Sequence, residues 1–153
     1  MTSATLSDPA ALLRGAGLRV TRPRVAVLSA LEAAPHASAD TVLADVRRAM
    51  GAVSVQAVYD VLNTLTEHGL IRRIQPAGSV ARYEVRVGDN HHHVVCRSCG
   101  TTADIDCVKG EAPCLEPNVL PSGFVLDEAE VTYWGLCASC RAAAANNLTT
   151  TTT

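Results

Sequence analysis

The chain has 153 residues, of which 48% are hydrophobic, and a formal net charge of −2. This length allows one ordinary core or two small ones, and the near-neutral charge argues against a protein that binds nucleic acid by bulk electrostatics. No stretch approaches the roughly 18 apolar residues of a membrane-spanning helix, and the amino end lacks the features of a secretory signal. We therefore expect a cytoplasmic protein with two small domains.

The charge is divided unequally along the chain. Residues 1–85 contain nine arginines, no lysine and seven acidic residues, a net charge of +2, whereas residues 86–153 contain four basic and eight acidic residues, a net charge of −4. The amino half can therefore face phosphate while the carboxyl half faces metal cations.

Three helices are predicted in the amino half, because apolar residues recur there at helical spacing after a residue that can cap a helix. The first follows Thr21 and has Pro23 in its first turn, where proline is tolerated. The second follows Ser38 and ends near Gly51, and the third follows Ser54.

The third helix is followed by two predicted strands, residues 70–74 and 80–85, with a Pro-Ala-Gly-Ser turn between them. The polar face of the helix carries Gln56, Tyr59, Asp60 and Asn63. Short helices joined by tight turns and followed by an arginine-bearing hairpin are typical of a winged helix-turn-helix, whose recognition helix enters a major groove. A generic helical bundle would give the same helical periodicity, so it is the hairpin that favours DNA binding.

Four cysteines form two Cys-x-x-Cys pairs, Cys96 with Cys99 and Cys137 with Cys140. Each pair places two thiolates on one tight turn, about the spacing that tetrahedral Zn²⁺ requires, and Gly100 lets the first turn close. The alternative is a pair of disulfides or redox-active dithiols. Because a chain without a secretory signal keeps its thiols reduced, the metal site is favoured.

These motifs together resemble the ferric uptake regulator (Fur) family over about residues 10–141. The segments that carry the resemblance are 18–24, 54–62, 69–71, 82–84, the histidines 91–93 and the two cysteine pairs. The Val-Tyr-Asp-Val-Leu sequence and residues 86–93 are most similar to the actinobacterial FurA/CatR subgroup, which is associated with control of catalase-peroxidase.

The resemblance implies an α+β protein, a homodimeric, metal-dependent transcriptional repressor that binds a palindromic operator in double-stranded DNA. It would regulate iron homeostasis, oxidative-stress genes, or both. The implied domains are a winged-helix DNA-binding domain at 1–85 and an α/β dimerisation domain at 86–145. Residues 146–153 are of low complexity, and we expect them to be a disordered tail.

Two metal sites are implied by the same resemblance. The structural zinc would be held by Cys96, Cys99, Cys137 and Cys140. The regulatory metal would be held by His36, Glu84, His91, His93 and Asp104. Three imidazoles and two carboxylates suit Fe²⁺, Mn²⁺ or Zn²⁺, and strand alternation places His91 and His93 on one side and His92 on the other.

Three of the five regulatory ligands also have a simpler interpretation. His36 follows a proline and could be a solvated turn residue, Glu84 could lie on the exposed face of a strand, and Asp104 could border a strand or turn. It is the joint match to the family that favours a metal site.

The DNA contacts implied by the resemblance lie on the third helix, where Tyr59 and Gln56 would be nearest the base edges. The candidates for phosphate contacts are Arg19, Arg22, Arg24, Arg72 and Arg73. Asp60 stands where the family commonly has arginine, so we expect an altered operator preference.

Other positions limit the number of metals. Ala129 replaces a histidine of a further site in many relatives, although the acidic Glu111 remains, so we expect two metals per chain. Cys107 and Cys114 lie outside the pairs and are either inert thiols or redox-active ones.

The alternatives for the function are a zinc- or peroxide-responsive member of the family, a zinc-ribbon interaction module and a zinc-binding dithiol redox protein. We expect no enzyme, because a four-cysteine zinc site has no open coordination position.

Overall fold

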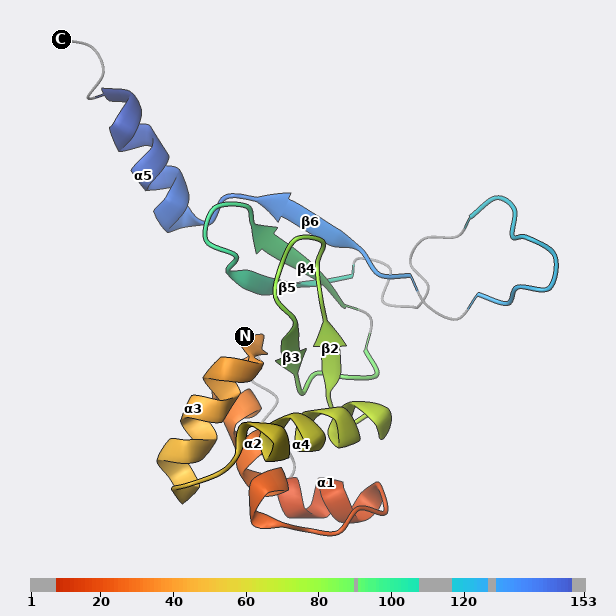
Figure 1. Cartoon of the computed structure of the whole chain (residues 1–153). Helices are drawn as coiled ribbons and strands as arrows, with labels where there is room; N and C mark the ends of the chain where they lie inside the picture. Colours follow the sequence, from red (N-terminus) through yellow and green to blue (C-terminus); the bar gives the residue numbers. More distant parts are fainter. Residues whose placement is uncertain (1–7, 90, 108–116, 127–128, 150–153) are drawn as a thin grey trace. The chain divides into compact units, whose positions relative to one another are not determined.

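The computed structural model describes residues 8–89, 91–107, 117–126 and 129–149 (Figure 1). The chain divides into two compact units, Met1–Val87 and Gly88–Thr153. Among the described residues, no helix combines the length and the apolar character needed to cross a membrane.

The described part of the first unit contains four helices, α1 (Pro9–Gly15), α2 (Arg22–Ala33), α3 (Ala39–Met50) and α4 (Val55–Glu67). The three helices predicted from caps and periodicity are confirmed as α2, α3 and α4. Helix α1 was not predicted, because its seven residues bury only one side chain, that of Leu13, and so show no apolar repeat.

The serine caps place the starts of two helices. The hydroxyl of Ser38 accepts the N–H of Thr41 at 3.2 Å, and the hydroxyl of Ser54 accepts the N–H of Ala57 at 3.1 Å. Each bond satisfies one of the N–H groups that a helix start leaves without a partner. Gly51, with a φ of +84°, ends α3 in a conformation that favours glycine.

The core of the first unit lies between α2, α3 and α4. Its fully buried side chains include Leu28, Leu31, Val42, Val46, Leu62 and Leu65. Burying one such side chain stabilises a fold by about 1.5–3 kcal/mol relative to leaving it in water. Because Val58, Leu62 and Leu65 occupy one face of α4, the opposite face of the helix is left to solvent, and all four polar residues predicted there are exposed.

A small antiparallel sheet completes the first unit, with β1 (Ala37–Ser38), β2 (Arg72–Ile74) and β3 (Arg82–Glu84) in the order β1-β3-β2. The hairpin of β2 and β3 confirms the predicted wing, with shorter strands than the sequence suggested. The two-residue strand β1 was not predicted. It pairs Ala37 with Tyr83 and so brings the preceding residue, His36, beside β3.

The second unit is built on a three-stranded sheet of β4 (His91–Cys96), β5 (Thr102–Asp106) and β6 (Thr132–Gly135), followed by α5 (Ala138–Thr149). The central strand β4 pairs antiparallel with β5 and parallel with β6. Mixed helix and sheet in the two units confirm the predicted α+β class.

The predicted disordered tail differs from the structure in its first half. Helix α5 continues to Thr149, so residues 146–149 are helical, and residues 150–153 lie outside the described part of the chain. The reason is local. Four consecutive alanines, residues 142–145, have the highest helix propensity of any residue type, and an established helix extends at low cost.

Candidate metal centres and DNA-facing surface

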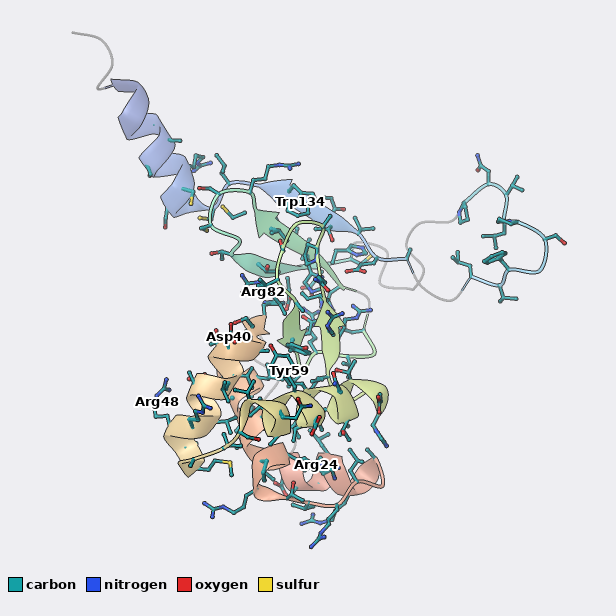
Figure 2. All side chains as sticks on the ribbon, in the orientation of Figure 1. Arg24, Asp40, Arg48, Tyr59, Arg82 and Trp134 are labelled. Carbon is teal, nitrogen blue, oxygen red and sulfur yellow. The ribbon has the colours of Figure 1, made fainter. Side chains whose placement is uncertain are left out.

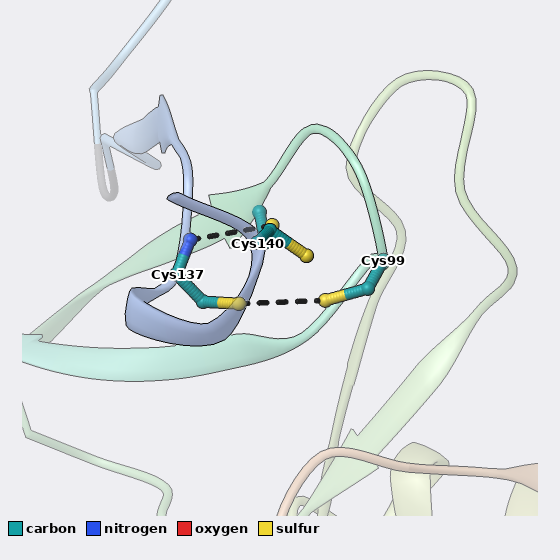
Figure 3. A group of neighbouring side chains, drawn as sticks. Cys99, Cys137 and Cys140 are labelled. Atoms are coloured by element: carbon teal, nitrogen blue, oxygen red, sulfur yellow. Dashed lines mark hydrogen bonds between the residues drawn. The ribbon is translucent and has the colours of Figure 1, made fainter. Parts of the chain in front are cut away.

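The four paired cysteines gather at one point of the second unit, and their sulfur atoms all lie within 4.8 Å of one another. The thiols of Cys99 and Cys137 are 3.7 Å apart (Figure 3). Sulfur ligands at about 2.3 Å from a tetrahedral Zn²⁺ lie about 3.8 Å from each other, whereas a disulfide joins sulfurs at about 2.05 Å. The five cysteines that the structure describes are all free thiols, so the disulfide alternative is wrong for both pairs.

Strand pairing and a tight turn assemble the cluster. Cys96 ends β4, and the N–H of Gly100 donates to its carbonyl at 2.9 Å, which closes the turn that carries Cys99. Gly100 has a φ of +73°, where a Cβ would strain the backbone. The parallel register of β4 with β6 sets Cys96 opposite Gly135, and Cys137 follows two residues later at the start of α5.

The backbone of the cluster favours thiolates. The N–H of Cys137 donates to the Cys96 sulfur at 3.3 Å, and this bond, with a second from the Cys99 N–H, lowers the pKa of Cys96 to about 6. The Thr101 hydroxyl lowers the pKa of Cys99 in the same way. The start of α5 adds the positive end of a helix dipole beside the second pair.

The pKa of the fourth thiol, that of Cys140, indicates that the cluster needs a cation. Although the Ser98 hydroxyl lowers the pKa of Cys140, the nearby thiols of Cys137 and Cys99 and the burial of the group together raise it to about 11. Four sulfurs this close cannot all ionise without a compensating cation. Soft thiolate donors in a tetrahedral set select Zn²⁺ among common divalent ions, so these residues fit the structural zinc.

The first unit holds a buried histidine–carboxylate pair. The Nε2 atom of His36 lies 2.9 Å from the Oε2 atom of Glu84, and the side chains are only 8% and 1% exposed. Arg82 fixes the backbone by donating from Nη1 to the carbonyl oxygen of His36 at 3.1 Å. His36 has a φ of +62°, a conformation that costs a non-glycine residue free energy and is often kept at functional sites.

The solvent-exposed interpretation is therefore wrong for both residues. His36 is not a solvated turn residue, and Glu84 does not lie on an exposed strand face. Strand β1 was not predicted, and its pairing with β3 brings His36 within contact distance of Glu84.

The second unit holds a cluster of histidine and carboxylate side chains across β4 and β5. His93 pairs with Asp104 in the strand register. The Nε2 atoms of His91 and His93 lie 3.7 Å and 3.6 Å from the same Asp104 oxygen. The two imidazole rings are 4.9 Å apart, whereas His92 packs against Tyr133 with ring centroids 6.3 Å apart. The predicted alternation is confirmed, but His92 is also buried.

Asp89 was missed by the sequence analysis. Its Oδ1 atom lies 2.7 Å from the Nδ1 atom of His91, on the side of the ring away from Asp104. A carboxylate two residues before a histidine run is the signal that could have identified it.

The candidate DNA contacts lie on the first unit (Figure 2). Tyr59 is 39% exposed on α4, and the Gln56 amide donates to the Asp60 carboxylate at 2.7 Å, one helical turn away. Among the arginines, Arg19, Arg22 and Arg73 are exposed, and Arg24 and Arg72 are half-buried. Arg24 donates to the carbonyl oxygen of Arg19 at 2.8 Å, which orders the segment before α2.

The structure describes only some of the two remaining cysteines and of the positions where many relatives have a further metal site. Cys107 is half-buried just after β5, and Ala129 precedes β6. Cys114 and Glu111 lie outside the described residues.

A winged-helix unit with an exposed recognition helix, followed by a unit with a four-thiolate cluster, defines a metal-binding transcriptional regulator. The model of the ferric uptake regulator family matches residues 15–117. The chain belongs to this family.

Similar proteins carry names of the same family. The chain is 64% identical over 136 residues to the transcriptional regulator FurA of Mycobacterium tuberculosis, covering 89% of this chain and 92% of that protein. It is 59% identical over 134 residues to ferric uptake regulation protein 1 of Mycolicibacterium fortuitum, covering 88% and 83%. Among solved structures, the ferric uptake regulator of Pseudomonas aeruginosa with manganese has a TM-score of 0.67 and 30% identity, covering 86% of this chain and 99% of that one.

Proposed function

We propose that the protein is a metal-dependent transcriptional repressor that binds a palindromic operator as a homodimer. Its regulatory metal would be held by His36, Glu84, His91, His93 and Asp104. The proposal is supported by the grouping of these donors. The first unit holds a buried His–Glu pair and the second a His–His–Asp cluster, so each unit holds part of the proposed ligand set.

The donor types indicate which ions to expect. Imidazole and carboxylate ligands suit Fe²⁺, Mn²⁺ and Zn²⁺, and the similar regulator of Pseudomonas aeruginosa was solved with manganese. That of Francisella tularensis, 28% identical to this chain with a TM-score of 0.67, was solved with iron. We assign Fe²⁺ as the first candidate ion, which makes iron homeostasis and oxidative-stress genes the expected targets.

Metal binding would couple the two units. The first unit offers two of the proposed donors and the second offers three, so an ion that takes ligands from both units would restrict how the winged helix is held. In a dimer, this restriction sets the separation of two recognition helices, and that separation must match successive major grooves. By linkage, metal raises operator affinity by the same factor as operator raises metal affinity.

The other metal site would act only in folding. Four thiolates around Zn²⁺ leave no open coordination position for a substrate, and the relatives are regulators. We therefore infer that the protein is not an enzyme, and that it acts in the cytoplasm, where its DNA target lies.

The phosphate-contacting role of Arg19 is testable by salt dependence. Arg19→Ala should weaken binding to all DNA sequences, and it should reduce the slope of log K against log salt by about one unit, because one phosphate contact fewer releases one counterion fewer. Fluorescence anisotropy of the metal-loaded protein across a salt series measures both effects. The matched control is Arg141→Ala, which removes the same charge from an exposed site of the second unit. If the salt slope changes equally in both variants, Arg19 does not contact a DNA phosphate.

Tyr59→Phe should give a different result. The substitution removes one hydroxyl from the exposed face of α4, so specific affinity should fall by about 1 kcal/mol, the net value of a typical hydrogen bond, with no change of salt slope. Competition between operator and random-sequence DNA, each measured by anisotropy, separates specific from general binding. Unchanged discrimination would show that this hydroxyl does not contribute to operator recognition.

A further inference from the structure

We propose that Asp89 is a positioning residue that presets His91 for metal binding, an inference that rests on the proposed regulatory site. The contact joins Asp89 Oδ1 to His91 Nδ1 at 2.7 Å, a distance typical of a charge-assisted hydrogen bond. The His91 side chain is fully buried, and Asp89 is 39% exposed at the edge of the unit. The histidine is therefore held from one side by a residue that reaches solvent.

The chemistry of the contact determines the tautomer of the imidazole. An ionised carboxylate only accepts hydrogen bonds, so the Nδ1 atom of His91 must carry a proton. In the neutral ring, the lone pair then lies on Nε2. A metal requires a deprotonated ring nitrogen, so Asp89 makes Nε2 the only available ligand atom of His91.

The direction of that ligand atom agrees with this role. His91 Nε2 faces the Asp104 oxygen at 3.7 Å, and His93 Nε2 approaches the same oxygen at 3.6 Å. Both Nε2 atoms therefore approach one carboxylate oxygen, while the other ring nitrogen of His91 contacts Asp89.

The backbone explains how Asp89 reaches the ring. Gly88 has a φ of +76°, a left-handed conformation that turns the chain just before β4. Across the sheet, the strand partner of His91 is Asp106, so a second carboxylate lies at the same rung. The Oδ1 atom of Asp89 lies at hydrogen-bond distance from the Nδ1 atom of His91, and we therefore assign the orienting role to Asp89.

Outer-shell carboxylates of this kind typically contribute 10- to 100-fold to metal affinity. In zinc-loaded protein stripped of the second metal, Asp89→Ala should weaken Mn²⁺ binding by a factor of this order. Asp89→Asn should lose less, because the amide oxygen still accepts the Nδ1 proton. The control is Glu130→Ala, which removes an exposed carboxylate from the same unit and should leave the affinity unchanged. Isothermal calorimetry with MnCl₂ gives the affinities.

A second readout uses the metal-free protein. Two-bond ¹⁵N–¹H NMR spectra of the histidine rings should show His91 as the Nδ1–H tautomer in the wild type and as a mixture in Asp89→Ala. Wild-type Mn²⁺ affinity in Asp89→Ala would overturn the inference, and a lower melting temperature with unchanged affinity would assign Asp89 a merely structural role. If the wild type binds no second metal, the proposed function fails as well. The Nδ1–H tautomer would then show the Asp89–His91 contact to be structural only.

Discussion

Cys137→Ser should lose the structural zinc and with it the fold of the second unit. The Cys137 sulfur lies 3.7 Å from that of Cys99, and its N–H holds the Cys96 sulfur, so this residue joins the two cysteine pairs. Structural zinc supplies on the order of 10 kcal/mol of apparent binding free energy, comparable to the whole stability of a small domain. Loss of one thiolate should therefore be global. Zinc content by mass spectrometry and thermal unfolding by circular dichroism measure the effect.

The matched control is Cys107→Ser, since Cys107 is a half-buried thiol of the same unit that lies outside the cluster. This variant should keep one zinc per chain and unfold near the wild-type temperature. If the Cys137→Ser protein contains no zinc and still unfolds at the temperature of the zinc-loaded wild type, the structural role of the zinc is contradicted.

His93→Ala should keep the zinc and the fold but lose the dependence of operator binding on the second metal. His93 is 1% exposed, and its Nε2 atom faces Asp104 at 3.6 Å in the regulatory cluster. Coupling between an effector and a ligand typically changes affinity about 5- to 150-fold, and this whole factor should vanish when the ion loses a direct ligand. Anisotropy of labelled operator, titrated with and without Mn²⁺, measures it.

His92→Ala is the control for this effect, because His92 lies on the other side of the same strand. Its burial against Tyr133 predicts some loss of stability, yet metal stimulation of DNA binding should persist. If His92→Ala abolishes the stimulation and His93→Ala does not, the ligand set has been assigned to the wrong side of β4.

The sequence predicted the features that depend on local chemistry. Ser38 and Ser54 identified two helix starts because a cap bond involves residues only three apart. The cysteine pairs identified a metal cluster because the spacing within each pair fixes the turn. The alternation of His91 and His93 followed from the geometry of a strand alone.

Features that depend on distant pairing were missed. Strand β1 is two residues long and exists only because β3 pairs with it, so no periodicity could reveal it. The contact between His36 and Glu84 depends on that pairing, so from the sequence alone both residues also had a solvent-exposed interpretation. The contact of Asp89 with His91 depends on where the chain before β4 places one side chain. A carboxylate two residues before a histidine run marks a candidate but does not determine that contact.

The most direct test of the account is the operator affinity of zinc-loaded protein with and without the second metal. Operator DNA would be selected from a random duplex library with Mn²⁺-loaded protein, and its binding would be measured by anisotropy without oxygen, after adding Fe²⁺, Mn²⁺ or a chelator that leaves the structural zinc in place. The account predicts that the protein binds this DNA tightly with either ion and weakly with the chelator. Equal affinity in all three conditions would contradict a metal-dependent regulator.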